Sequence, residues 1–149
     1  MPLNVSRRAI AKAGLLIVAM AATQGLARAD DMPAEGPAGD LFDIVWQVTE
    51  LAGADPVTAH VPTLTVNLAG SAGGNTGCNV YFATATVDGA SISFSGIGST
   101  YIACDEAVME QERAFLQALE LIAQFKLDDG GLQLLDHDGA VLVRLAATS

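Results

Sequence analysis

The sequence predicts an α+β domain in which an antiparallel β-sheet or cracked β-barrel packs against one amphipathic α-helix. Apolar and polar residues alternate in several short segments, as in strands with one buried face. Turn sequences such as Asp-Gly separate these segments, which is typical of antiparallel hairpins. A single segment, 106–123, lacks Gly and Pro and repeats its apolar residues at helical spacing. The length of 149 residues suits one such domain.

Residues 1–29 have the three-part organisation of a cleaved export signal. Arg7, Arg8 and Lys12 are followed by the apolar run 13–22 and by a small-x-small cleavage site at 27–29. The run is shorter than the roughly 20 residues that a membrane span needs. The paired arginines resemble a twin-arginine signal, so we expect export to the periplasm or the extracellular space by the twin-arginine or the general secretory route. Contact with a membrane is then transient, through the signal.

The mature chain begins with an acidic stretch, 30–40, that offers little to bury and is expected to be a flexible linker. The folded domain follows at 41–149. Its first strand is expected at 42–51, where the large apolar residues Ile44, Trp46 and Val48 occupy every second position, and its second at 64–68.

The Gly-rich segment 70–77 is expected to be a flexible turn. It lacks the Lys of a phosphate-binding loop and leads into no predicted helix, which argues against a phosphate site.

Two hairpin units are predicted further along the chain. The first joins 79–87 to 90–95 through Asp88-Gly89, because Gly readily adopts the positive φ of tight turns. The second covers 126–145 and holds three short strands and two turns. Its turn 136–139 resembles the start of a calcium loop but lacks the later ligands, so a hairpin turn is favoured.

The helix is expected to bury a stripe that includes Val108, Phe115 and Leu119. Asp105 is placed to act as its N-cap. The exposed face is predicted to carry Glu110, Gln111, Arg113, Gln117 and Glu120.

Cys78 and Cys104 are the only cysteines, and export would place them in an oxidising compartment. A disulfide between them is therefore predicted. The alternative is a reactive thiol, although neither cysteine has an evident Cys or His partner nearby in the sequence.

Composition excludes several classes of partner. After Ala29 the chain has three basic and seventeen acidic residues, which disfavours nucleic acid and anionic membrane surfaces. Two His and two Cys leave few ligands for a metal or a metal cofactor, and none is expected.

No catalytic arrangement stands out either. Ser71, Ser99, His60 and His137 supply the residue types of a triad, but the G-x-S-x-G pattern is absent. We therefore expect a protein that is not an enzyme and that works as a monomer.

Several short motifs occur in a characteristic order. The chain resembles the META domain family, the HslJ-like proteins, over about residues 41–145. The resemblance rests on Trp46, on Gly77-Cys78-Asn79, on 99–104, on 110–112, on 115–119 and on 132–134. Ile102 stands where the family usually has Met, and 82–85 lacks the usual Gly and aromatic residue.

The resemblance implies a sheet or cracked barrel with one helix, in an envelope protein linked to heat shock or antibiotic tolerance and without an established enzymatic activity. The expected function is support of envelope integrity or stress tolerance through an unknown envelope protein. The alternative is a lipid- or acyl-binding carrier, or a pilot-like chaperone, that holds an apolar ligand. The expected lining of such a cavity is Trp46, Tyr81, Phe94, Phe115 and Leu119.

Overall fold

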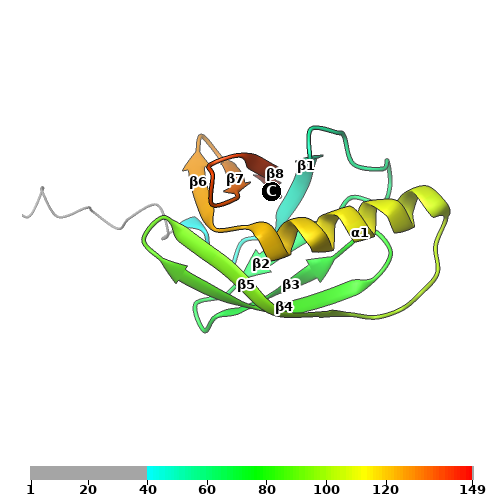
Figure 1. Cartoon of the computed structure of the whole chain (residues 1–149), viewed down its shortest axis with the longest axis horizontal. Helices are drawn as coiled ribbons and strands as arrows, with labels where there is room; N and C mark the ends of the chain where they lie inside the picture. The colour runs from blue at the N-terminus through cyan, green and yellow to red at the C-terminus, as the bar shows by residue number, and fades with distance from the viewer. Residues whose placement is uncertain (1–39, 149) are drawn as a thin grey trace, which may run out of the picture. The chain divides into compact units, whose positions relative to one another are not determined.

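The computed structural model describes residues 40–148, which form eight strands and one helix (Figure 1). The expected export signal (1–29) and all of the expected linker except Asp40 lie outside the described residues. The elements in chain order are β1 (Trp46–Leu51), β2 (Thr63–Val66), β3 (Ser71–Asn75), β4 (Val80–Asp88), β5 (Ser91–Ser99), α1 (Glu106–Leu121), β6 (Gln124–Asp128), β7 (Gly131–Leu135) and β8 (Val141–Ala147).

All strand pairs are antiparallel and follow the chain order, and β8 pairs back with β1. Three of the joins are short: β1 meets β2 and β2 meets β3 at two residue pairs each, and β5 meets β6 at one, Ser91 with Gln124. The sheet therefore curls round until its ends meet, and the β5–β6 join is its weakest seam. The predicted α+β fold, a cracked barrel with one helix, is confirmed.

Helix α1 fills the space that the short β5–β6 join leaves. It connects the end of β5 to the beginning of β6 and packs alongside β5 (Figure 1). Among residues 40–148, no helix combines the length and apolar character needed to cross a membrane.

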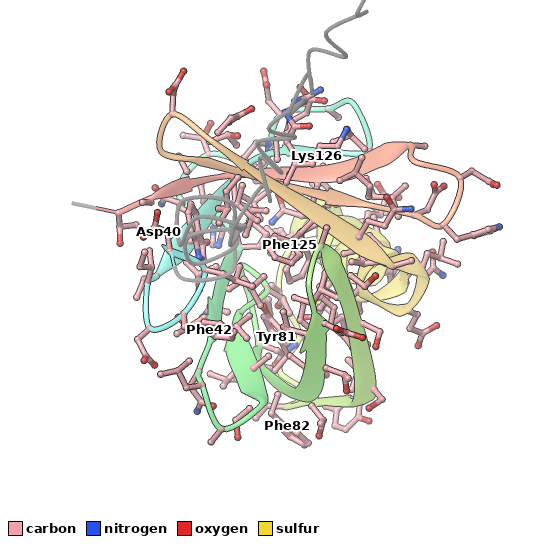
Figure 2. The ribbon with its side chains drawn as sticks, turned by 90° about the vertical axis from the view of Figure 1, so that its left-hand side faces the viewer. Asp40, Phe42, Tyr81, Phe82, Phe125 and Lys126 are labelled. Atoms are coloured by element: carbon pink, nitrogen blue, oxygen red, sulfur yellow. A yellow bond between two sulfur atoms is a disulfide. The ribbon has the colours of Figure 1, made fainter. Side chains whose placement is uncertain are left out.

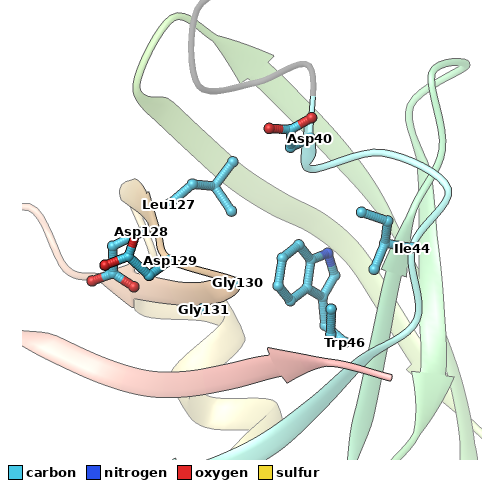
Figure 3. A pocket seen from close by; sticks show the side chains of 9 residues that line it. Asp40, Ile44, Trp46, Leu127, Asp128, Asp129, Gly130 and Gly131 are labelled. Carbon is cyan, nitrogen blue, oxygen red and sulfur yellow. The ribbon is translucent and has the colours of Figure 1, made fainter. Parts of the chain in front are cut away.

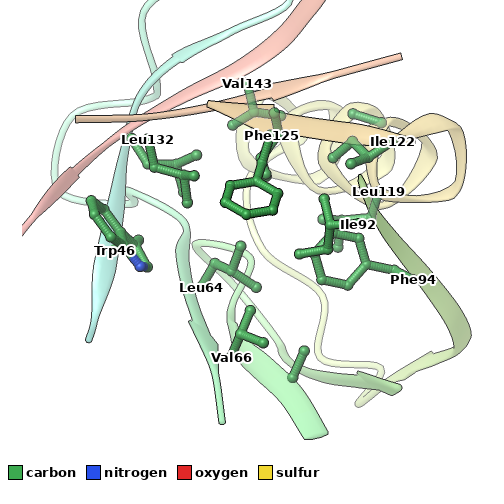
Figure 4. Close-up of a cluster of buried hydrophobic side chains, with 14 of the residues drawn as sticks. Trp46, Leu64, Val66, Ile92, Phe94, Leu119, Ile122, Phe125, Leu132 and Val143 are labelled. Carbon is green, nitrogen blue, oxygen red and sulfur yellow. The ribbon is translucent and has the colours of Figure 1, made fainter. Parts of the chain in front are cut away.

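The core lies between the inner faces of the strands and the helix. Strand β4 shows the alternation clearly, because Tyr81 is buried while Phe82 on the opposite face is exposed. Figure 2 shows the same contrast between Phe125, which points inward, and Lys126, which points outward. In Figure 4, Phe125 lies among apolar side chains from several strands and from the helix region.

The Gly-rich segment is a strand, not the flexible turn that composition indicated. Strand β3 pairs with β2 on one side and with β4 on the other. A Cβ at Gly73 would lie 2.8 Å from the Tyr81 carbonyl oxygen, and one at Gly74 would overlap the Thr63 carbonyl group. Glycine is therefore needed here for close approach of neighbouring backbones rather than for flexibility.

The strand and hairpin predictions are otherwise correct apart from some boundaries. Strand β1 begins at Trp46 rather than at residue 42, and Ile44 precedes it half-buried. Strand β2 ends at Val66 because the Asn67 carbonyl and side chain accept backbone N–H bonds from Gly70 and Ser71, which forms a turn.

The helix also differs from its prediction at both ends. It ends at Leu121, since Ile122 is already extended. Asp105 occupies the N-cap position, but its side chain makes no capping hydrogen bond, so the expected side-chain cap is wrong. The Asp105 carbonyl oxygen instead accepts a bond from the Met109 amide.

Candidate functional site

The described part of the chain buries four polar side chains, and they lie together between the β3–β4 loop and the helix. We call them the polar cluster: Thr76, Asn79, Gln111 and Glu112. Sequence periodicity predicted Gln111 on the exposed face of the helix, and that prediction is wrong, because only 8% of Gln111 is exposed. The reason is that the cluster supplies hydrogen bonds that make polar burial tolerable.

Glu112 lies at the centre of the polar cluster. Its carboxylate accepts a bond of 2.5 Å from the Thr76 hydroxyl and bonds of 2.8 and 3.1 Å from the Asn79 amide. The carboxylate is thus held by neutral donors, which hydrogen-bond the charge in place of water.

Asn79 extends the polar cluster to the segment that follows β5. Its side-chain oxygen accepts bonds from the Thr100 hydroxyl, at 2.9 Å, and from the Ile102 amide, at 2.6 Å. Its side-chain nitrogen also donates to the Ile102 carbonyl oxygen. A single amide therefore connects β4, the segment after β5 and the helix.

Gln111 extends the polar cluster in the other direction, to the loop between β1 and β2. Its amide nitrogen donates to the His60 carbonyl oxygen at 2.6 Å, and its oxygen accepts from the Val57 amide at 2.7 Å. A Cβ at Gly77 would overlap the His60 carbonyl and would lie 2.7 Å from the Gln111 nitrogen. Glycine is required at 77 both for this contact and for a φ of +101°.

Cys78 and Cys104 form a disulfide beside the polar cluster, with their Cα atoms 6.1 Å apart. The predicted pairing is confirmed. Cys78 lies in the β3–β4 loop and Cys104 lies just before the helix. The disulfide therefore links the same two regions as the polar cluster, namely the β3–β4 loop and the N-terminal part of the helix. This arrangement explains why the motifs around 77–79, 99–104 and 110–112 occur together in one chain.

The polar cluster is fully hydrogen-bonded by other groups of the protein. Throughout residues 40–148, every buried side-chain nitrogen and oxygen has a hydrogen-bond partner. His60 uses Nδ1 for a 3.0 Å hydrogen bond with the Gly77 carbonyl group, and His137 is exposed in the β7–β8 loop. In the same part of the chain, no three His, Cys, Asp or Glu side chains gather as metal ligands would.

The turn 136–139 lies in the loop between β7 and β8, as predicted. The Asp136 carboxylate accepts backbone bonds from Asp138 and Ala140, which holds the loop.

The five residues predicted to line a cavity are all part of the buried core. They are Trp46, Tyr81, Phe94, Phe115 and Leu119. Tyr81 and Phe115 contact each other edge to face, with ring centres 5.3 Å apart. The Tyr81 hydroxyl donates to the Thr63 carbonyl oxygen at 2.7 Å, and burial raises the pKa of this hydroxyl well above its ordinary value.

Trp46 is the member of this group that also borders an open pocket. The pocket has a volume of about 450 Å³ and lies where the β6–β7 turn approaches the chain before β1 (Figure 3). We call it the Trp46 pocket, and its lining consists of Asp40, Ile44, Trp46, Leu127, Asp128, Asp129, Gly130, Gly131 and Ala147.

The Trp46 pocket has an apolar interior and an acidic rim. Ile44 and Leu127 flank the indole ring, whose N–H donates to the Leu41 carbonyl oxygen at 3.1 Å. Asp40, Asp128 and Asp129 are exposed around it. Asp128 ends β6 and Asp129 lies in the β6–β7 turn, and both are exposed. The sequence gave no signal that this turn borders a pocket.

Comparisons with known proteins agree on the fold. The family model described as META domain matches residues 39–149. The chain is similar to a protein from Burkholderia xenovorans solved by NMR, with 25% identity, a TM-score of 0.62, and coverage of 76% of this chain and 88% of that one. No curated protein matches the chain.

A crystal structure of a DUF4847 family protein from Bacteroides vulgatus shows the same fold. The identity is 14%, the TM-score is 0.56, and the match covers 74% of this chain and 96% of that one. A further protein solved by NMR, 17% identical, gives a TM-score of 0.59 with coverage of 72% and 92%.

Proposed function

The chain belongs to the META domain family, and from this premise we propose that it is an exported protein without catalytic activity that supports the cell envelope by binding. The observation that carries the proposal is the Cys78–Cys104 disulfide, because such bonds persist in oxidising compartments. The basic, apolar and small-x-small stretches of residues 1–29 support the same location.

Export is tested by the mass and location of the mature protein. Cleavage after Ala29 should leave a chain that begins at Asp30. Arg7→Lys with Arg8→Lys should block export by the twin-arginine route, whereas Arg113→Lys, outside the signal, should not. Full-length protein retained in the membrane would contradict the proposal, and unchanged export of the double variant would indicate the general secretory route.

The proposal of a non-catalytic role is supported by how the reactive side chains are used. Both cysteines are bonded to each other, and His60 Nδ1 is engaged with a backbone carbonyl. In a strain that lacks the protein, we expect reduced survival of heat and antibiotic exposure. Complementation with His60→Ala or His137→Ala should restore survival. Failure of a folded His137→Ala protein would indicate proton transfer and would overturn the proposal.

A second candidate function, carriage of a small apolar ligand, is favoured by the Trp46 pocket. A volume of about 450 Å³ is within the usual range of small-molecule sites, roughly 300–1,000 Å³. Mass spectrometry of material that co-purifies with the mature protein tests this function. Leu127→Asp should remove the ligand, and Leu121→Asp, on an exposed part of the helix, should keep it.

A further inference from the structure

We propose that the Trp46 pocket selects a small amphiphilic organic cation, with an apolar body and an ammonium or guanidinium head. This inference rests on the second candidate function, since it names the ligand class of that site. It follows from the shape of the pocket, from the charges at its rim and from the charge of the domain around it.

The inside of the pocket suits an apolar body. Ile44 and Leu127 stand on opposite sides of the Trp46 ring (Figure 3), and Ala147 completes the wall. An aliphatic or aromatic group that enters this space removes apolar surface from water, which is favourable by about 25 cal/mol for each Å².

The rim suits a positive head. Asp40 comes from the chain before β1, whereas Asp128 ends β6 and Asp129 lies in the β6–β7 turn, so acidic groups border the pocket from two separate segments. Within residues 40–148, none of the three takes part in an ion pair. The Asp128 carboxylate accepts only a 3.3 Å bond from the Gln133 side chain, and it therefore keeps lone pairs for a ligand.

The surrounding charges favour the same sign of ligand. Residues 40–148 contain fourteen acidic and three basic side chains. Of these basic side chains, Arg144 forms an ion pair with Glu50, with 3.6 Å between Nε and Oε1. Lys126 points outward from β6, opposite to the inward-facing Phe125 (Figure 2). A carboxylate or phosphate ligand would meet repulsion at the rim, and a cation would meet attraction.

The test uses three probes of equal chain length and different charge: octylammonium, octanol and octanoate. Trp46 is the only tryptophan of the chain, so its fluorescence reports directly on the pocket. Calorimetric titration provides a second measurement that does not depend on the indole. We expect octylammonium to bind about tenfold more tightly than octanol, which corresponds to about 1.4 kcal/mol, and octanoate to bind most weakly.

A matched pair of variants locates the effect. Asp128→Asn with Asp129→Asn should abolish the preference for octylammonium and leave octanol binding unchanged. Asp138→Asn with Glu120→Gln removes the same charge from exposed positions outside the pocket and should keep the preference. Added salt should weaken octylammonium binding and not octanol binding.

The outcomes separate the two proposals. Equal binding of octanol and octylammonium, or tighter binding of octanoate, would overturn cation selection and leave the carrier function standing. Absence of binding by all three probes in both measurements would overturn both. A preference for the cation that the Asp138 and Glu120 variant loses equally would show a general charge effect and would overturn the assignment to this pocket.

Discussion

At the scale of single residues, Glu112 stabilises the fold through its hydrogen bonds. Its carboxylate is buried and receives three hydrogen bonds from Thr76 and Asn79. Removing it takes the carboxylate acceptor from a buried hydroxyl and a buried amide, which then have only the Asn79 and Ile102 carbonyl oxygens as acceptors, and hydrogen bonds to a charged group contribute about 1.5–3 kcal/mol each.

We therefore predict that Glu112→Ala lowers the free energy of unfolding by about 2–4 kcal/mol. Glu110→Ala, on an exposed neighbour, should change it by less than about 0.5 kcal/mol. Urea titration of both variants measures the difference. Equal stability of the two would mean that the polar cluster contributes nothing to the fold.

Tyr81 makes stability depend on alkaline pH. Burial raises the pKa of its hydroxyl in the folded protein, so the unfolded chain releases this proton first, near pH 10. Stability from Tyr81 is complete below that pH and falls above it, by up to about 1.4 kcal/mol per pH unit.

Tyr81→Phe should flatten this alkaline decline. It should also lose about 1 kcal/mol at neutral pH, because the hydrogen bond to the Thr63 carbonyl disappears. Unfolding curves at several pH values check both effects, with Tyr101→Phe, at an exposed position, as the control. An unchanged decline in Tyr81→Phe would refute the assignment.

At the scale of secondary-structure elements, the helix contributes a large share of the core. Leu119 is fully buried and Glu120 is exposed, although they are neighbours in sequence. Leu119→Ala should cost about 2–5 kcal/mol through lost burial and a cavity, and Glu120→Ala less than about 0.5 kcal/mol. Thermal unfolding of the two variants measures the difference. Equal Tm values for Leu119→Ala and Glu120→Ala would contradict this packing.

The disulfide should contribute on a similar scale. It links cysteines 26 positions apart, and closing a loop of that size stabilises by about 3.5 kcal/mol on the chain-entropy model. The double variant Cys78→Ser, Cys104→Ser should unfold at correspondingly lower denaturant. Its stability should match that of the reduced wild-type protein. Retention of wild-type stability by the double variant would show that the bond constrains little.

The elements that could be predicted from sequence are those with local signals. The β4–β5 hairpin follows from alternation and from Gly89, whose φ is +58° in the turn. The polar cluster could not be predicted, because Gln111 and its His60 partner are 51 positions apart and Glu112 and Asn79 are 33 apart. Strand β3 was missed because close backbone approach selects Gly, which sequence patterns associate with turns.

At the scale of the whole molecule, the excess of acidic side chains should oppose folding. Residues 40–148 have fourteen acidic and three basic groups. Raising NaCl from about 0.02 M to about 0.5 M should raise the Tm by several degrees, because screening weakens this repulsion.

The variant Glu106→Gln, Glu120→Gln, Asp138→Asn should respond less to salt, since all three groups are exposed and contribute to the repulsion. Calorimetry of both proteins measures the change. An equal response would attribute the salt effect to something other than charge.

The pairing of β1 with β8 determines when the domain can finish folding. Trp46 lies opposite Ala147, so the first strand made by the ribosome is completed by the last. The β1–β8 pair can form only after β8 has been synthesised, so until then β1 has only its two-residue pairing with β2. Truncation of β8 would deprive β1 of its longest partner.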